Sequence, residues 1–195
     1  MTKEFYKIFQ GIFPYNINNI EVKDFLSQFE DTQFQQLLMD NRSSDFEINS
    51  VKQGDIFENI PITRTYLNSN NKLETNTIKE KAMLISNSCD AERRHYVLFA
   101  PVLPLSNFNH NKNIINSIKK NEKASAIYIG DIGYQDSYID ISATTSLELK
   151  AFKYFLENKK IVKKDELNQY GYYLLLAKIS HFLVRPESDE VFRYD

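Results

Sequence analysis

The sequence predicts an α+β fold in which a run of short strands lies between helical segments. Three observations predict it. Apolar residues recur at three- and four-residue steps near both ends of the chain, as in amphipathic helices. Segments rich in β-branched and aromatic residues, bounded by turn-forming residues, occupy the middle. Strands and helices do not alternate in a regular order, which argues against a doubly wound parallel sheet.

Composition limits the class of protein. The chain has 195 residues, of which 42% are hydrophobic and 13% aromatic, enough for a folded core. The formal net charge of −2 gives the whole molecule no general attraction for nucleic acid. We expect a cytoplasmic protein with no membrane partner, because the sequence has no secretory signal and no long apolar stretch. One cysteine and three scattered histidines lack metal-ligand spacing, so neither a metal nor a cofactor is predicted.

Residues 19–40 are predicted to form a helix. Its apolar positions recur at helical steps and are Val22, Phe25, Leu26, Phe29, Phe34, Leu37 and Leu38. Asn18 and Glu21 resemble a capping pair at its start. The polar break "NRSSD" at 41–45 then predicts a boundary between an N-terminal helical extension, 1–45, and a second domain, 46–195.

The first strands of the second domain are expected between residues 54 and 105. The segment 54–67, "GDIFENIPITRTYL", has the composition of a strand, and the Asn-rich segment 68–72 that of a turn. The segments 82–87 and 96–105 are nearly continuous apolar runs, as expected for strands that are buried on both faces. Pro101 and Pro104 should bend the second run near its end.

Helices and strands then mix toward the C-terminus. Residues 111–121 are predicted to form a short helix, and the segments 125–132 and 137–142 two further strands. A last helix should begin at the acidic pair Asp165–Glu166 and end at Arg185–Pro186. Because its "YYLLLA" stretch is apolar on all sides, this helix is expected to be packed against the domain.

Four motifs resemble those of the MazF/PemK family of bacterial toxin ribonucleases. In chain order they are "QGDIF" (53–57), "AMLISN" (82–87), "VLFAPV" (97–102) and "SYIDISATTSLELKAF" (137–152), and the resemblance spans residues 51–185. It implies a small curved β-barrel, similar to Src-homology-3 barrels, that pairs into a homodimer. It also implies metal-independent cleavage of single-stranded RNA. The helical segment before residue 45 is an addition to the family's pattern.

The two catalytic positions of that family are not matched. The position of its arginine falls on Glu80 or Lys81, and the position of its threonine falls on Leu103, with Ser106 the nearest hydroxyl. Leucine can neither move a proton nor stabilise a phosphorane oxygen, and a glutamate would repel that oxygen. The resemblance therefore carries over the fold but not the catalytic pair.

The segment 86–95 holds the candidate catalytic residues Cys89, Asp90, Arg93, Arg94 and His95. The arginines would lower the pKa of the Cys89 thiol, whose thiolate is the nucleophilic form, and His95 could act as a base. The alternative is structural: a buried cysteine at a strand end, followed by a solvated turn in which Asp90 accepts backbone hydrogen bonds.

Candidate substrate-binding residues lie around the same segment. They are Lys81, Ser86, Ser88, Tyr96 and Ser106. Arginines and lysines suit an RNA phosphate backbone, and the rings of Tyr66, Tyr96 and Phe99 could stack on bases. The alternative is that these charges are solvated side chains at hairpin tips.

Three functional hypotheses follow. The first is a MazF-like ribonuclease that acts on single-stranded RNA with non-standard catalytic residues. The second is a non-enzymatic interaction or accessory module of a bacterial toxin–antitoxin or phage-defence system, with an antitoxin or another defence protein as its partner. The third, weaker one is thiol chemistry or redox sensing at Cys89.

Overall fold

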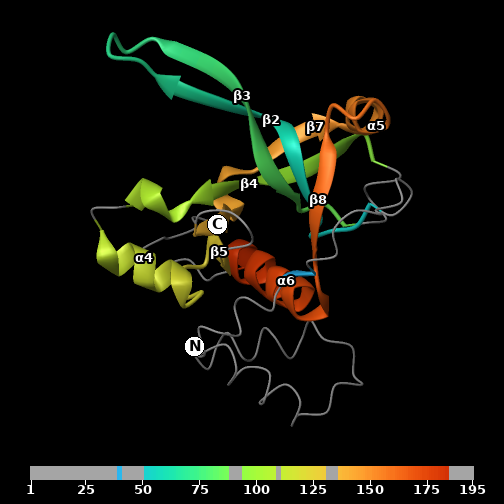
Figure 1. The fold of residues 1–195 in the computed structure, drawn as a ribbon. Coiled ribbons are helices and arrows are strands. Elements are labelled where there is room, and N and C mark those ends of the chain that lie inside the picture. The colour runs from blue at the N-terminus through green and yellow to red at the C-terminus, as the bar shows by residue number, and fades with distance from the viewer. Residues whose placement is uncertain (1–38, 41–50, 88–93, 109–110, 131–135, 185–195) are drawn as a thin grey trace, which may run out of the picture.

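The computed structural model describes residues 39–40, 51–87, 94–108, 111–130 and 136–184, and it has the predicted α+β class (Figure 1). The strands are β1 (Met39–Asp40), β2 (Ile56–Leu67), β3 (Leu73–Leu84), β4 (Tyr96–Pro104), β5 (Ala126–Gly130), β6 (Ser137–Asp140), β7 (Thr145–Glu148) and β8 (Val162–Leu167). The helices are α4 (Lys112–Lys119), α5 (Leu149–Glu157) and α6 (Gln169–Val184), with two 3₁₀ turns, η2 (Leu105–Phe108) and η3 (Ile141–Ala143).

The sheet is antiparallel and open. Its strand order is β1-β8-β2-β3-β4-β6-β5, and β7 also pairs with β4. The expected closed barrel is not formed, because β1 and β5 end this order and no pairing joins them among the described residues. Closure needs strands that stay paired along both edges. Here β2 and β3 run on together beyond their pairing with β8 and β4, and leave the sheet as a hairpin (Figure 1).

Two cores lie on opposite faces of the sheet because neighbouring residues of a strand point to opposite sides. On one face, Phe57 of β2 packs with Phe99 and Phe152, its ring centroid 6.0 and 5.3 Å from theirs, beneath α5. On the other face, Ile56 belongs to a second cluster that includes Leu175 of α6. The buried centre of α6 confirms the packed C-terminal helix.

A third cluster packs α4 against β5 and β6. Ile118 of α4 is fully buried there with Tyr138 of β6. The Lys119 ammonium pairs with the Asp136 carboxylate, which also accepts a hydrogen bond of 2.8 Å from the Tyr128 hydroxyl. These contacts confirm the short helix that was predicted in 111–121 and fix it on the sheet.

β6 and β7 together form one interrupted strand along β4. Val102 of β4 pairs with Ile139 of β6, and Phe99 pairs with Thr145 of β7. Between them the chain makes η3, whose start is capped by Asp140: its Oδ1 accepts from the Ser142 amide at 3.0 Å. β4 therefore borders two segments that are paired separately.

Several local predictions are confirmed and several are wrong. The strand in 54–67, the turn at 68–72 and the strands in 96–105, 125–132 and 137–142 are present. β3 begins at Leu73, well before the predicted "AMLISN" strand, and α5 was not predicted as a separate helix. The expected helix start at 165–167 is wrong, since these residues belong to β8 and pair with β2 and β1.

Two further expectations need correction. β4 is not buried on both faces over its whole length, because Tyr96 and Leu98 are exposed. The last two residues of the helix predicted over 19–40 form β1 and pair with β8. The rest of that helix, the polar break at 41–45 and the boundary at 45 lie outside the described residues. None of the helices within the described part of the chain is long and apolar enough to cross a membrane.

Candidate functional site

The predicted catalytic cluster is only partly placed. Ser88, Cys89, Asp90 and Arg93 lie outside the described residues, so the thiol hypothesis stays a prediction. Arg94, His95 and Tyr96 are described, and all three are exposed at the start of β4. The His95 carbonyl accepts a hydrogen bond of 2.8 Å from the Leu149 amide, which ties this start to α5.

Of the other predicted substrate-binding residues that the structure describes, Ser86 contacts the start of β4, and Lys81 and Ser106 lie elsewhere. The Ser86 hydroxyl accepts from the Leu98 amide at 2.8 Å, so it extends the pairing of β3 with β4. The Lys81 ammonium lies 3.5 Å from the Glu58 carboxylate. Ser106 follows the far end of β4, about 25 Å from Tyr96 at 3.3 Å per residue. Phe99 is fully buried and offers no stacking surface, so that prediction is wrong.

The two positions that the family's catalytic residues would occupy have structural partners. Glu80 forms an ion pair of 2.9 Å with Arg64 across the β2–β3 hairpin. Leu103 is half-buried against the cluster beneath α4. Neither of these two side chains can stabilise the negative charge of a phosphorane. In the alternative alignment the arginine position falls on Lys81, whose ammonium lies 3.5 Å from the Glu58 carboxylate.

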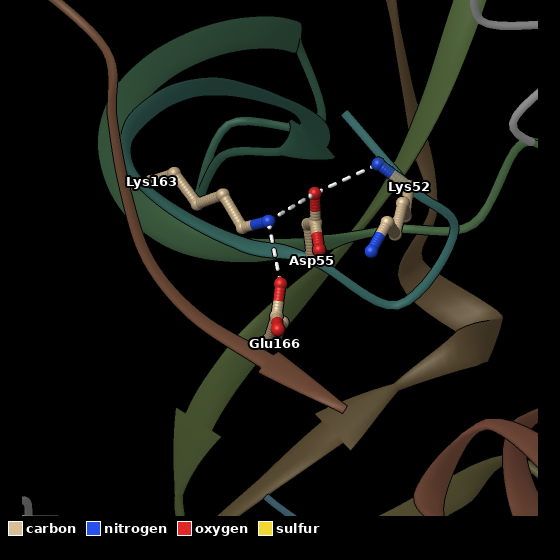
Figure 2. Close-up of polar contacts among 4 residues, drawn as sticks. All are labelled: Lys52, Asp55, Lys163 and Glu166. Atoms are coloured by element: carbon tan, nitrogen blue, oxygen red, sulfur yellow. Dashed lines mark hydrogen bonds and ion pairs between the residues drawn. The ribbon is translucent and has the colours of Figure 1, made fainter. Parts of the chain in front are cut away.

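The "QGDIF" motif builds a buried polar network at the start of β2 (Figure 2). The Asp55 carboxylate is 1% exposed and accepts a hydrogen bond of 2.7 Å from the Lys52 amide. The Lys163 ammonium of β8 lies 2.9 Å from Asp55 and 2.9 Å from Glu166, so one cation joins two carboxylates. Burial raises the pKa of Asp55, although the Lys52 amide and the Lys163 ammonium act to lower it.

The same motif needs a glycine at position 54 for a separate structural reason. Its φ is +94°, a backbone conformation that residues with a side chain rarely adopt. A Cβ built here would lie 2.8 Å from Cδ1 of Leu167 in β8. Its amide donates to the Leu84 carbonyl at 2.8 Å, and the Leu84 amide donates back to the Asp55 carbonyl at 2.8 Å. The motif thus joins β2, β3 and β8.

A pocket of about 250 Å³ opens beside this network. It is lined by Lys52, Gln53, Asp55, Glu166, Leu167, Asn168 and Tyr172. Several of its polar groups already bind one another or the backbone. The Gln53 amide donates to the Ile85 carbonyl at 2.6 Å, the Tyr172 hydroxyl lies 3.4 Å from Gln53 Oε1, and Asn168 Oδ1 caps α6 through the Gly171 amide at 2.9 Å. The sequence patterns did not predict this site, although the Gly-Asp pair before a strand is a signal for it.

The most exposed described element is the outer part of the β2–β3 hairpin, residues 63–77, which we name the arm (Figure 1). Its strands are held by cross-strand threonine contacts: the hydroxyls of Thr63 and Thr77 lie 3.1 Å apart, and those of Thr65 and Thr75 3.3 Å apart. Large apolar side chains end it, with Tyr66 48%, Leu67 64% and Leu73 72% exposed.

Both edges of the arm lack a neighbouring strand within the described part of the chain. β8 pairs with β2 at Ile56–Glu58, and β4 pairs with β3 at Ala82–Leu84. Beyond these pairs, the backbone N–H and C=O groups on the outer edge of each strand face no neighbouring strand of the described residues. Such a ribbon can accept another strand.

No group of three or more His, Cys, Asp or Glu side chains in the described residues could hold a metal ion. No family model matches the chain, and no curated protein matches it.

Proposed function

We propose that this protein is a MazF/PemK-related interaction module of a bacterial toxin–antitoxin or phage-defence system, which binds another protein through the tip of its arm. The observation that carries the proposal is the exposure of three large apolar side chains at the end of a projecting hairpin. Leu67 and Leu73 pair across the hairpin on one face, and Tyr66 lies on the opposite face. Adjacent apolar side chains raised into water mark interaction sites, because a partner that covers them removes apolar surface from water.

The residues at the family's catalytic positions support a binding role over the family's chemistry. Glu80 carries a negative charge that is paired with Arg64, and Leu103 packs into a core. A developing negative charge on phosphorus gains no stabilisation from either side chain. If the arginine position falls on Lys81 instead, its ammonium already lies 3.5 Å from the Glu58 carboxylate. Binding through the arm, by contrast, requires no catalytic residue.

Replacing Tyr66 and Leu67 with serine is expected to abolish partner capture. Immobilised wild-type protein should retain its partner from a lysate of the source organism, and the double variant should retain at least tenfold less, because each buried large apolar side chain contributes about 1.5–3 kcal/mol. Leu183→Ser is the matched control, since Leu183 is 72% exposed but lies on α6. Quantitative mass spectrometry measures the difference. Equal capture by the wild type and the tip variant would refute the proposal.

A second candidate function, RNA cleavage, is favoured by one observation: Arg94, His95 and Tyr96 are consecutive and exposed. A guanidinium can bind phosphate and a ring can stack on a base. An imidazole can take the proton of a 2′-hydroxyl as its oxygen attacks the adjacent phosphorus. The bond from phosphorus to the 5′-oxygen then breaks and that oxygen takes a proton from water, which gives a 2′,3′-cyclic phosphate and a 5′-hydroxyl.

If the protein cleaves RNA, His95→Ala should slow cleavage of an unstructured, mixed-sequence RNA by about 10²–10⁴-fold, the usual contribution of a general base. Tyr96→Ala should weaken RNA binding, whereas Tyr154→Ala, which removes a ring 54% exposed on α5, should not. Gel analysis of end-labelled RNA measures both effects. RNA that stays intact at high protein concentration, or cleavage that is indifferent to His95→Ala, would exclude this candidate.

A further inference from the structure

We infer that two copies of this protein pair edge to edge through β3 of the arm, so that the two hairpins form one four-stranded antiparallel sheet about a two-fold axis at Asn76. This inference rests on the proposed function, because it takes the arm to be an interaction element, and it names the second copy as the occupant of the arm's β3 edge.

The first step is the direction of the backbone groups in the arm. The Asn68 amide donates to the Lys72 carbonyl at 2.9 Å, which makes this pair hydrogen-bonded across the hairpin. Hydrogen-bonded and non-hydrogen-bonded pairs alternate along an antiparallel ladder. The next pair, Leu67 with Leu73, therefore turns its N–H and C=O groups outward, and so does every second pair after it. On β3 the outward-facing residues are Leu73, Thr75, Thr77 and Lys79.

The second step is the difference between the two edges. Pro61 of β2 pairs with Lys79, an outward-facing position, so its missing N–H interrupts the β2 edge and leaves the internal ladder intact. β3 has no proline between Leu73 and Lys81. The pairing of β4 with β3 ends at Pro101, which pairs with Ala82. The edge of β3 before Ala82 is therefore not covered by β4. The β3 edge is therefore the better template for an added strand.

The third step is the register of two antiparallel β3 strands. With the axis at Asn76, Thr75 faces Thr77 of the second copy and extends the threonine contacts that measure 3.1 and 3.3 Å inside each hairpin. Lys72 then faces Glu80 across the new edge, and unlike charges attract there.

Neighbouring registers are poorer. An axis at Thr77 would place the like charges of Glu74 and Glu80 opposite each other, and an axis at Thr75 would bring no two charged residues opposite each other. Like charges directly opposite each other destabilise a strand pair. Charge complementarity therefore selects the Asn76-centred register among the three.

Sedimentation equilibrium between about 1 µM and about 1 mM tests the pairing. The wild type should show a reversible monomer–dimer equilibrium. Thr75→Pro removes an outward N–H at the centre of the new edge and should raise the dimer dissociation constant at least tenfold. Thr65→Pro is the matched control, because Thr65 is the cross-strand partner of Thr75 and its outward N–H lies on the β2 edge. A monomer throughout this range, or equal effects of the two proline variants, would overturn the inference.

A cysteine placed at the axis tests the register itself. In a Cys89→Ser background, Asn76→Cys should form a disulfide-linked dimer under mild oxidation, because facing residues in a non-hydrogen-bonded pair have Cα atoms about 4.5 Å apart. Asn70→Cys in the hairpin turn is the control and should form no disulfide-linked dimer. Equal cross-linking of both variants would overturn the register.

The two proposals fail separately. The Tyr66→Ser and Leu67→Ser changes lie on β2 and should leave the dissociation constant of the dimer unchanged. A protein that stays monomeric but still captures its partner through the tip refutes the paired edge alone. A dimer that captures nothing refutes the interaction module alone.

Discussion

Replacing Lys163 with methionine is expected to lower the free energy of unfolding by about 3–5 kcal/mol, the usual cost of removing one partner from a buried ion pair. Methionine keeps much of the aliphatic stem, so the change removes mainly the charge and its hydrogen bonds. It leaves the carboxylates of Asp55 and Glu166 without the ammonium that lies 2.9 Å from each. Asp55 is 1% exposed, so its unpaired carboxylate would remain largely desolvated. Urea unfolding at pH 7 measures the loss.

Lys164→Met is the matched control for this result. Lys164 is the next residue, 41% exposed, and lies 3.3 Å from Glu58, so its loss should cost less than about 1 kcal/mol. The loss in Lys163→Met should also shrink as the pH falls toward 5. Burial already raises the pKa of Asp55, and without the ammonium that pKa rises further. In Lys163→Met, Asp55 of the native state therefore binds a proton at a higher pH than it does in the unfolded chain. The stability of this variant consequently increases as the pH falls. Equal losses for the two variants would contradict the network's role.

Lys178→Met is expected to change how stability depends on pH. Burial lowers the pKa of Lys178 to about 7 from its ordinary value of 10.5. Between these values the unfolded chain binds more protons than the native chain, so this group makes the protein more stable as the pH rises. From pH 7 to pH 9 the wild type should gain about 2 kcal/mol relative to the variant, since one pKa unit corresponds to about 1.4 kcal/mol. Denaturant unfolding at several pH values measures that difference.

The contacts of Lys178 predict a further, constant loss in the same variant. The ammonium donates to the carbonyls of Asn121 and, at 3.0 Å, Lys123, and so ties α6 to the segment before β5. The nearby charge that acts on it is that of Glu122. Lys120→Met, at an exposed residue close by, should keep the wild-type pH profile. If the profile of Lys178→Met runs parallel to that of the wild type, Lys178 titrates near its ordinary pKa and the prediction is wrong.

Local patterns in the sequence predicted the elements whose side chains carry a clear signal. The Asn-rich turn at 68–72 and the isoleucine face of α4 are examples. The outer part of β3 was missed because its residues are exposed on both faces and show no apolar alternation. β8, "VKKDEL", reads as polar, and pairing with β2 makes it a strand.

The candidate sites show the same division. The exposure of Arg94, His95 and Tyr96 agrees with a polar segment between two apolar strands. The network around Asp55 was not predicted, because Lys163 and Glu166 come from a strand far along the chain whose place beside β2 is fixed only by the fold. The strand predicted over 96–105 already implied that Tyr96 and Ser106 lie at opposite ends of it, and β4 agrees with this.

The turn η3 makes the two halves of β4's partner strand independent of each other. A slip of one residue in a paired strand moves all of its side chains to the opposite face. Because η3 separates β6 from β7, a slip in one of them need not pass to the other. A substitution that shifts the register of β6 along β4 can therefore leave the side chains of β7 on their original faces.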